Sequence, residues 1–243
     1  MATGPGISIR IRDKRFATSA VPLFSDFSLD IAPHSVVSLV GASGVGKSSL
    51  LRMIGGIDSD FDGEILIDNI PARDAPVAGF VLQDARLLPW LTALDNLRAV
   101  APGVSVERAE ALLDQVGLRG AGNAFPHELS GGMQRRVALA RAFSVNARLL
   151  LLDEPFVSLD RTLVAELQAL FVHLIDAERP TVVMVTHLAE DAALLADRAV
   201  VLSGRPARIV SDMAVDIARG ARTISDRLRL SAEIDQRARE TVA

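Results

Sequence analysis

Residues 36–50, VVSLVGASGVGKSSL, constrain the fold of this chain more than any other stretch. The apolar residues 36–40 read as a buried strand, a glycine-rich turn follows, and a helix is expected to begin at Lys47. The motif G-x-x-x-x-G-K-S between a strand and a helix is the P-loop, which binds the phosphates of a nucleotide. Chance gives this pattern in roughly one chain of this composition per thousand. The alternative is a flexible strand-to-helix turn that binds no ligand.

Each residue type in this loop suits a phosphate ligand. Gly41, Gly44 and Gly46 allow backbone N–H groups to approach phosphate oxygens, and the helix that follows adds its own unpaired N–H groups. Lys47, one of only two lysines among 26 basic residues, supplies a charge for the β- and γ-phosphates, and the Ser48 hydroxyl can bind Mg²⁺. The expected nucleotide-binding residues of the loop are Gly41, Ser43, Gly44, Val45, Gly46, Lys47, Ser48 and Ser49.

Composition excludes several classes of protein. The 243 residues suit one large domain, or one domain with an inserted subdomain. No apolar run approaches the roughly 18 residues of a membrane span, and the N-terminus lacks the apolar region of a signal peptide, so we expect a cytoplasmic protein. The absence of cysteine excludes disulfides and cysteine chemistry. A net charge of −4 without a basic tract argues against nucleic-acid binding.

The hydrophobic pattern predicts an α/β fold. Short alternating segments at 7–12, 27–31 and 63–67 indicate a small antiparallel sheet beside the nucleotide site. Apolar runs that alternate with helical segments indicate a parallel sheet that is buried on both faces. The expected strands of that sheet are 36–40, 79–82, 149–152 and 181–186, with helices at 161–177 and 188–196. Helices at 92–100, 105–116 and 132–146 form a helical insertion, and two short strands near 199–210 precede an arginine-rich helical tail.

The segment LLLLDEP, residues 149–155, supplies the acidic element that a P-loop ATPase needs. Asp153 follows four apolar residues and therefore emerges at the carboxyl end of a buried strand, where open α/β sheets bind their ligands. Asp153 suits a role at Mg²⁺, and Glu154 is placed to orient or deprotonate the attacking water. The alternative is a pair of solvated carboxylates at a strand end.

A second anion site is expected at residues 129–134, LSGGMQ. Ser130 is a good helix N-cap, and Gly131 and Gly132 leave the first N–H groups of the following helix accessible. One phosphate chain rarely needs two helix N-termini from one polypeptide. We therefore expect a dimer in which this site closes on the ATP of the partner, although the same residues can form an ordinary capped turn.

The order of these motifs resembles an ABC-transporter ATPase subunit over nearly the whole chain. The matching segments are GASGVGKS (41–48), Gln83, LSGGMQRRVALARA (129–142), LLLLDEP (149–155), SLD (158–160) and THLAEDA (186–192). The resemblance implies a P-loop NTPase (RecA-like) core with a mainly parallel sheet, a small antiparallel β subdomain and an inserted helical subdomain. It also implies that Gln83 contacts Mg²⁺ and water, that Asp160 links the two sites of a dimer, and that His187 senses the γ-phosphate; a structural role is the alternative for His187.

The chain departs from the family pattern at several positions. Phe16 stands where the family often has a tyrosine that stacks on adenine, and this chain contains no tyrosine. Phenylalanine keeps the aromatic face, but a position in the core is the alternative. The signature reads LSGGM, with its glutamine one place later at Gln134, and Ser49 replaces the usual threonine. Neither change removes a donor that hydrolysis needs.

Residues 87–96, LLPWLTALDN, and the segment RPARI at 205–209 resemble the ATPases of importers for nitrate, sulfonates, taurine and bicarbonate. Pro89 excludes an ordinary helix interior, so Trp90 is expected on a loop. A loop tryptophan suits a groove that receives a permease helix, and packing inside the fold is the alternative.

The sequence therefore predicts the ATPase subunit of an importer for a small anion, with ATP and Mg²⁺ as cofactors. The expected partners are a second copy of the chain, separate permease subunits and, indirectly, a solute-binding protein; the expected location is the cytoplasmic face of the inner membrane. We expect a nucleotide-binding core with the β subdomain at 1–86 and 147–212, a helical subdomain at 87–146 and a tail at 213–243. The alternatives are a non-transport ABC ATPase, a P-loop kinase, which would leave LSGGMQ unexplained, and a subunit that binds ATP without turnover.

Overall fold

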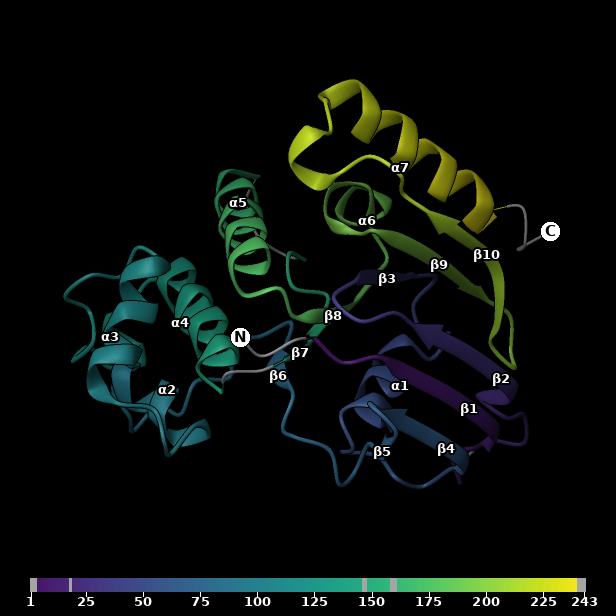
Figure 1. The fold of residues 1–243 in the computed structure, drawn as a ribbon, viewed down its shortest axis with the longest axis horizontal. Coiled ribbons are helices and arrows are strands. Elements are labelled where there is room, and N and C mark those ends of the chain that lie inside the picture. The colour runs from purple at the N-terminus through teal and green to yellow at the C-terminus, as the bar shows by residue number, and fades with distance from the viewer. Residues whose placement is uncertain (1–3, 18, 146–147, 158–160, 240–243) are drawn as a thin grey trace.

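Two β-sheets form the framework of the molecule (Figure 1). The computed structural model describes residues 4–17, 19–145, 148–157 and 161–239. The first sheet has the strand order β2-β1-β4-β5 and is antiparallel. Its strands are β1 (Ile7–Lys14), β2 (Phe24–Ile31), β4 (Asp62–Ile67) and β5 (Ile70–Pro71).

The second sheet has the order β10-β9-β3-β8-β7-β6 and is parallel except for its edge strand β10. Its strands are β3 (Val36–Val40), β6 (Gly79–Val81), β7 (Leu149–Asp153), β8 (Thr181–Thr186), β9 (Arg198–Ser203) and β10 (Arg208–Ala214). The central strands β3 and β8 are buried along their whole length, as expected for a parallel sheet covered on both faces.

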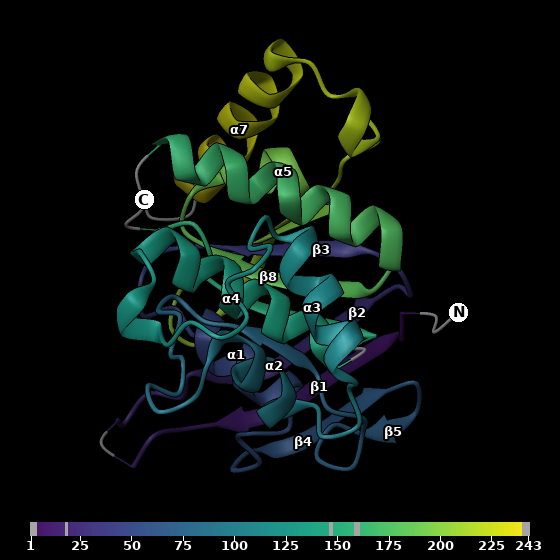
Figure 2. The ribbon, with the colours of Figure 1, turned by 90° about the vertical axis from the view of Figure 1, so that its left-hand side faces the viewer.

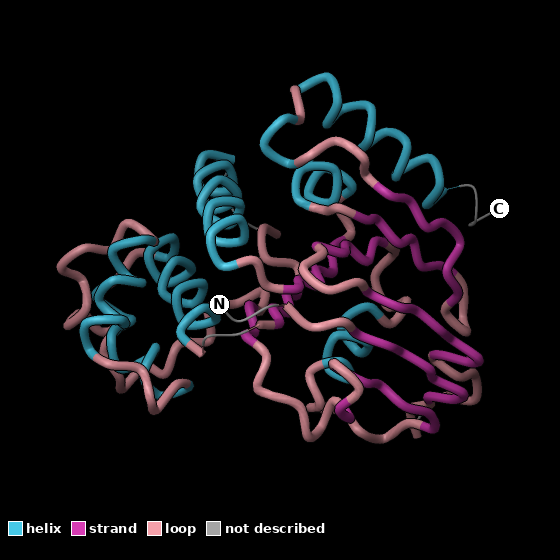
Figure 3. Tube along the Cα trace, in the orientation of Figure 1, coloured by secondary structure: helices cyan, strands magenta, loops and turns pink. Residues whose placement is uncertain are grey.

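Helices cover both faces of the parallel sheet (Figure 2). They are α1 (Lys47–Ile54), α2 (Ala93–Val100), α3 (Val106–Gln115), α4 (Gly131–Ser144), α5 (Arg161–Glu178), α6 (Ala189–Leu195) and α7 (Ile224–Arg239), with short 3₁₀ turns at η1 (Pro126–Glu128) and η2 (Arg219–Ala221). Figure 3 shows α2, α3 and α4 grouped at one end of the molecule, away from the antiparallel sheet.

The alternation of side chains along β7 explains how one sheet serves two cores. Leu149 and Leu151 point into a core that also contains α1 and the antiparallel sheet. Leu150 and Leu152 point into the other core, which contains residues of α2 to α5. The run of four leucines therefore packs against α1 and the antiparallel sheet on one face and against α2 to α5 on the other.

Arg222 joins the segment before α7 to the end of α6. Its side chain is 4% exposed and donates hydrogen bonds to the carbonyls of Ala193 and Leu194, both at 2.9 Å, and of Ala196, at 2.7 Å, at the end of α6. It also donates to the carbonyl of Ile217 at 2.8 Å. These bonds satisfy carbonyls that a helix C-terminus leaves without partners inside the helix.

The expected fold class is confirmed. The antiparallel sheet, the parallel sheet and the helical insertion all occur in the predicted order, and most elements end within three residues of the predicted limits. Among the helices that the structure describes, none is both long and apolar enough to cross a membrane.

Candidate ATP site

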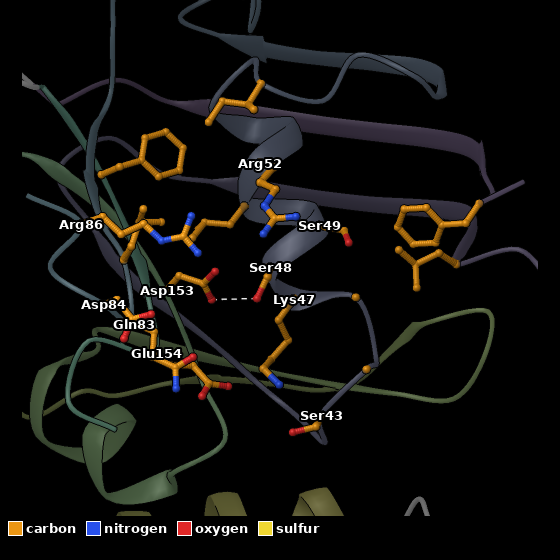
Figure 4. A pocket seen from close by; sticks show the side chains of 18 of the residues that line it. Ser43, Lys47, Ser48, Ser49, Arg52, Gln83, Asp84, Arg86, Asp153 and Glu154 are labelled. Carbon is orange, nitrogen blue, oxygen red and sulfur yellow. Dashed lines mark hydrogen bonds between the residues drawn. The ribbon is translucent and has the colours of Figure 1, made fainter. Parts of the chain in front are cut away.

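A pocket of about 1110 Å³ lies beside α1 and the carboxyl ends of β6 and β7 (Figure 4). It brings together side chains from the N-terminal segment, the glycine-rich loop, the segment after β6 and the end of β7. The predicted site residues that line it are Phe16, Ser43, Gly44, Gly46, Lys47, Ser48, Ser49, Gln83, Asp153 and Glu154. This grouping agrees with the rule that open α/β sheets bind ligands at the carboxyl ends of their strands.

The glycine-rich loop has the backbone conformation that a phosphate cradle needs. Gly44 and Gly46 have φ values of +81° and +113°, which residues that carry a side chain rarely adopt. Gly46 is the N-cap of α1 and brings no side chain, so the first N–H groups of the helix are open to an anion. A Cβ on Gly46 would also lie 2.9 Å from the Phe24 ring, and one on Gly41 would lie 2.4 Å from the Leu202 carbonyl. Glycine is therefore required here for both conformation and space.

The ammonium group of Lys47 lies folded back onto this loop. Its Nζ donates to the carbonyls of Gly41, at 2.7 Å, and Ala42, at 3.0 Å. Burial lowers the pKa of Lys47, and the charges of Glu154 and Asp153 act in the opposite direction. The lysine is thus a buried cation whose partners are neutral carbonyls. Phosphate oxygens carry charge and would form stronger hydrogen bonds with it than these carbonyls do.

Ser48 and Asp153 are in direct contact. The Ser48 hydroxyl donates a hydrogen bond of 2.7 Å to Asp153 Oδ1 (Figure 4). Oxygen ligands of this kind suit Mg²⁺, and the Gln83 amide lines the same pocket. The described residues contain no group of three or more carboxylate, imidazole or thiol side chains that could hold a metal by themselves. Mg²⁺ usually takes one or two carboxylates together with phosphates and water, and the residues present fit that pattern.

Glu154, the residue after β7, has a left-handed backbone conformation. Its φ is +48°, a conformation that costs of order 1–3 kcal/mol for a residue with a side chain and is concentrated at functional sites. The backbone N–H of Glu154 donates to the Val185 carbonyl at 3.0 Å. Its carboxylate Oε2 lies 3.3 Å from Nδ1 of His187. The structure therefore brings together the predicted base and the predicted phosphate sensor.

A buried acid fixes the turn that carries His187. Asp191 accepts hydrogen bonds from Gln168 Nε2, at 2.9 Å, and from the Thr186 hydroxyl, at 3.3 Å. The Thr186 hydroxyl in turn accepts from the N–H of Leu188 at 2.9 Å. Burial raises the pKa of Asp191 to about 6. Sequence reasoning did not single out Asp191, although it lies within the segment THLAEDA and four residues after the histidine.

The serine–glycine segment lies apart from this pocket. Ser130 caps α4, where its hydroxyl accepts from the N–H of Met133 at 3.2 Å, and Gly131 has open space where a Cβ would stand. Ser130, Gly131 and Gly132 are not among the residues that line the pocket, so one chain does not bring its two predicted anion sites together. Asp160 lies outside the described residues.

Two arginines of α4 hold the segment around Gln83. Arg135 donates to the Leu82 carbonyl at 3.2 Å. Arg141 donates to the carbonyls of Ala85, at 2.9 Å, and Arg86, at 2.8 Å. The glutamine is thus bracketed by contacts to the helix that begins at the serine–glycine segment.

A comparison with known families identifies the architecture. A family model described as "ABC transporter" matches residues 24–157. The chain belongs to the ABC transporter family. It is therefore an ATPase. The resemblance inferred from the motifs is confirmed, and a P-loop kinase is excluded.

Individual ABC proteins align with most of the chain. An aliphatic sulfonates import ATP-binding protein, SsuB 1, of Xanthomonas axonopodis pv. citri is 39% identical over 222 residues, which cover 88% of this chain and 87% of the relative. SsuB 2 of Rhodococcus jostii is 46% identical over 189 residues, 78% of this chain and 75% of the relative. A solved dimeric, post-hydrolysis ATP-binding cassette with ADP and Pi has a TM-score of 0.75 and 29% identity, covering 87% of this chain and all of that cassette.

Trp90 of this ABC subunit lies on the surface, in the loop before α2, where its exposed fraction is 69%. Buried Asn96 fixes the loop: its Oδ1 accepts from the N–H of Leu88 at 2.8 Å, and its Nδ2 donates to the carbonyls of Leu88, Leu91 and Thr92. The alternative that Trp90 packs inside the fold is wrong, because the loop presents the indole to solvent.

Sequence reasoning missed several side chains that line the pocket. Arg52, Asp84, Arg86 and Arg205 also line the pocket. Arg52 could have been found by helical spacing, because it lies one turn after Ser48 on α1. Arg205 belongs to the RPARI segment, which suggested only a subgroup of transporters.

Proposed function

We propose that the chain is the ATPase subunit of an importer for aliphatic sulfonates. The observation that carries this proposal is the 39% identity to a sulfonate import subunit, of which the alignment covers 87%. The residues 87–96 and 205–209, which suggested the nitrate, sulfonate, taurine and bicarbonate group, agree with it. A non-transport ABC ATPase has no comparable support.

The proposed binding mode follows from the contacts that the side chains of the pocket make within the protein. Lys47 would exchange the carbonyls of Gly41 and Ala42 for the β- and γ-phosphates, and the N–H groups at the start of α1 would bind the remaining phosphate oxygens. Ser48, Asp153 and Gln83 would hold Mg²⁺, which neutralises phosphate charge when bound.

Hydrolysis would depend on Glu154 and His187. Glu154 is placed to orient the attacking water and accept its proton, and His187, 3.3 Å away, would hold that carboxylate and contact the γ-phosphate. An intact pair of this kind argues against a subunit that binds ATP without turnover.

The aromatic ring of Phe16 is the proposed platform for adenine. Its exposed fraction is 43%, and it lines the ATP pocket. A core residue would be buried, so these observations favour the stacking role over the core alternative.

A second copy of the chain would complete each site. The open space at Gly131 and the capped start of α4 suit contact with the ATP of the partner, and Asp160 would link the two sites. The dimeric cassette among the solved relatives supports this arrangement. Each nucleotide would then lie between the glycine-rich loop of one copy and Ser130 of the other.

The Trp90 loop would receive a permease helix. An exposed aromatic side chain on a loop fixed by Asn96 is a suitable anchor for such a contact. The permease, and indirectly a solute-binding protein, would be separate polypeptides, and the subunit would lie at the cytoplasmic face of the inner membrane. The proposed division is a core at 1–86 and 147–212, a helical subdomain at 87–146 and a tail at 213–243.

Growth on a sulfonate tests this function. In a strain that lacks the gene for this chain, the wild-type protein should restore growth when an aliphatic sulfonate is the only sulfur source. Glu154→Gln should not, because loss of a general base slows hydrolysis by about 10²- to 10⁴-fold while ATP still binds. Growth on sulfate is the control. If the strain that lacks the gene grows on the sulfonate as well as the wild-type strain does, the proposed solute is contradicted. If Glu154→Gln restores growth, the proposed role of Glu154 is contradicted.

A further inference from the structure

Lys14 is a buried cation at the edge of the ATP site. It ends β1, and its side chain is only 2% exposed. Its Nζ donates to Asp58 Oδ1 at 2.9 Å and to the Asp60 carbonyl at 2.5 Å, and Asp60 Oδ2 lies 3.6 Å away. The same Nζ lies over the Phe16 ring, 5.4 Å from its centroid, within the range of a cation–π interaction.

These contacts connect two segments that line the pocket. Phe16 lines it directly, and Ile57, next to Asp58, lines it as well. The N–H groups of Ile57 and Asp58 bond to the Arg52 carbonyl at 2.9 and 3.3 Å, so the loop that holds Lys14 continues from the end of α1. Lys14 therefore ties the aromatic ring to the helix whose other end forms the phosphate cradle.

The chemistry of an ammonium group suits this position. An ammonium has three N–H donors on a flexible stem, and here the Asp58 carboxylate, the carbonyl and carboxylate of Asp60 and the Phe16 ring lie around it. A guanidinium is planar and wider, and it cannot spread its donors over these directions in a site that is 2% exposed. Lysine stands here in a chain that otherwise uses it only at Lys47.

We propose that Lys14 is a positioning residue for the nucleobase: it holds the Phe16 ring at a fixed place relative to the phosphate cradle. This inference rests on the proposed stacking of Phe16 on adenine. Because Lys14 lies over one face of the Phe16 ring, the exposed part of the ring remains available for stacking on the base. Lys14 then affects affinity for the nucleoside part of ATP and leaves affinity for the triphosphate part unchanged.

The test compares two ligands and two variants. Lys14→Met removes the charge and keeps an unbranched stem, and the matched control is Arg12→Met on the same strand, whose side chain pairs with Asp62 and is 73% exposed. Isothermal titration calorimetry measures the affinity of each full-length variant for a non-hydrolysable ATP analogue and for inorganic tripolyphosphate. We expect Lys14→Met to weaken binding of the analogue about 5- to 30-fold, with tripolyphosphate unchanged, and Arg12→Met to change neither.

Combination with Phe16→Ala separates positioning from general destabilisation. If Lys14 acts through the ring, Lys14→Met should weaken analogue binding no further in a Phe16→Ala background. Equal weakening for both ligands, or full additivity with Phe16→Ala, would overturn the proposal. If Lys14→Met does not fold, Asp58→Asn, which loosens the same contact, should show a smaller loss confined to the analogue, and a loss shared by tripolyphosphate would overturn the proposal.

The same data separate this inference from the proposed function. A wild-type protein that does not bind the analogue would refute the ATP site itself. An unchanged affinity in Phe16→Ala would refute the adenine platform and the inference with it. A loss of affinity in Phe16→Ala together with an unchanged affinity in Lys14→Met would refute only the role of Lys14.

Discussion

Replacement of Arg222 by methionine should destabilise the whole chain, although the residue does not line the pocket beside the glycine-rich loop. The guanidinium makes four hydrogen bonds to carbonyls at the end of α6 and before α7, and its side chain is 4% exposed. Methionine fills part of the volume but donates no hydrogen bond. Buried carbonyls would then lose their partners in a place that water reaches poorly.

The magnitude follows from two opposing contributions. A hydrogen bond from a charged donor contributes about 1.5–3 kcal/mol, so four such bonds set an upper limit near 6–12 kcal/mol. Burial of the charge works against them, as the lowered pKa of Arg222 shows. A buried carbonyl that is left without its donor costs about 1–3 kcal/mol. We expect Arg222→Met to lower the free energy of unfolding by about 3 kcal/mol.

Urea unfolding followed by circular dichroism measures this loss. The control is Arg229→Met, seven residues later on α7, because Arg229 is 68% exposed and pairs at the surface with Asp226 at 3.7 Å. Such pairs contribute about 0–0.5 kcal/mol. A loss below about 1 kcal/mol for Arg222→Met, or one equal to that of the control, would refute the idea that the guanidinium holds α6.

Two further predictions concern the site. Burial raises the pKa of Asp191 from 3.8 to about 6, so the folded protein binds more protons than the unfolded chain between these pH values, and its stability falls as pH rises through them. As the pH rises from about 4 to about 7, the free energy of unfolding of Asp191→Asn should therefore increase by about 3 kcal/mol relative to that of the wild type. Urea titrations at each pH measure this difference, and parallel pH profiles of the two proteins would contradict the prediction. An equal mixture of Ser130→Arg and Lys47→Ala chains should hydrolyse ATP faster than either variant alone, because one hybrid site carries both defects and the other carries neither. Phosphate release no greater than in the separate variants would count against sites shared between two copies.

The parts of the fold that were predicted depend on local patterns. The glycine-rich turn, the run of four leucines and the Ser130 cap each identify a structure within a few residues, and all three occur as expected. The limits of β1 and β2 were less accurate, because the two strands pair as far as Lys14 and Phe24, beyond the alternating segments. Pairing with a distant strand extended them, and no local pattern encodes that.

The buried charges could not be predicted, because their partners are far apart in sequence. Lys14 meets Asp58, Arg222 meets the end of α6, and Asp191 meets Gln168. A charged residue in an alternating or helical pattern reads as solvated, and only the packing of separate elements buries it. The grouping of Lys47, Ser48, Asp153 and Glu154 in one pocket could be predicted, because these residues occur at fixed positions in contiguous motifs.

The contacts on both sides of Gln83 have a mechanical consequence. Arg135 and Arg141 clamp the backbone before and after this glutamine to α4, so the glutamine and the start of α4 cannot shift independently. In the proposed dimer, a displacement of the helical end of the molecule would therefore reach two nucleotides: the chain's own, through the Gln83 amide, and that of the second copy, through Ser130 at the start of α4.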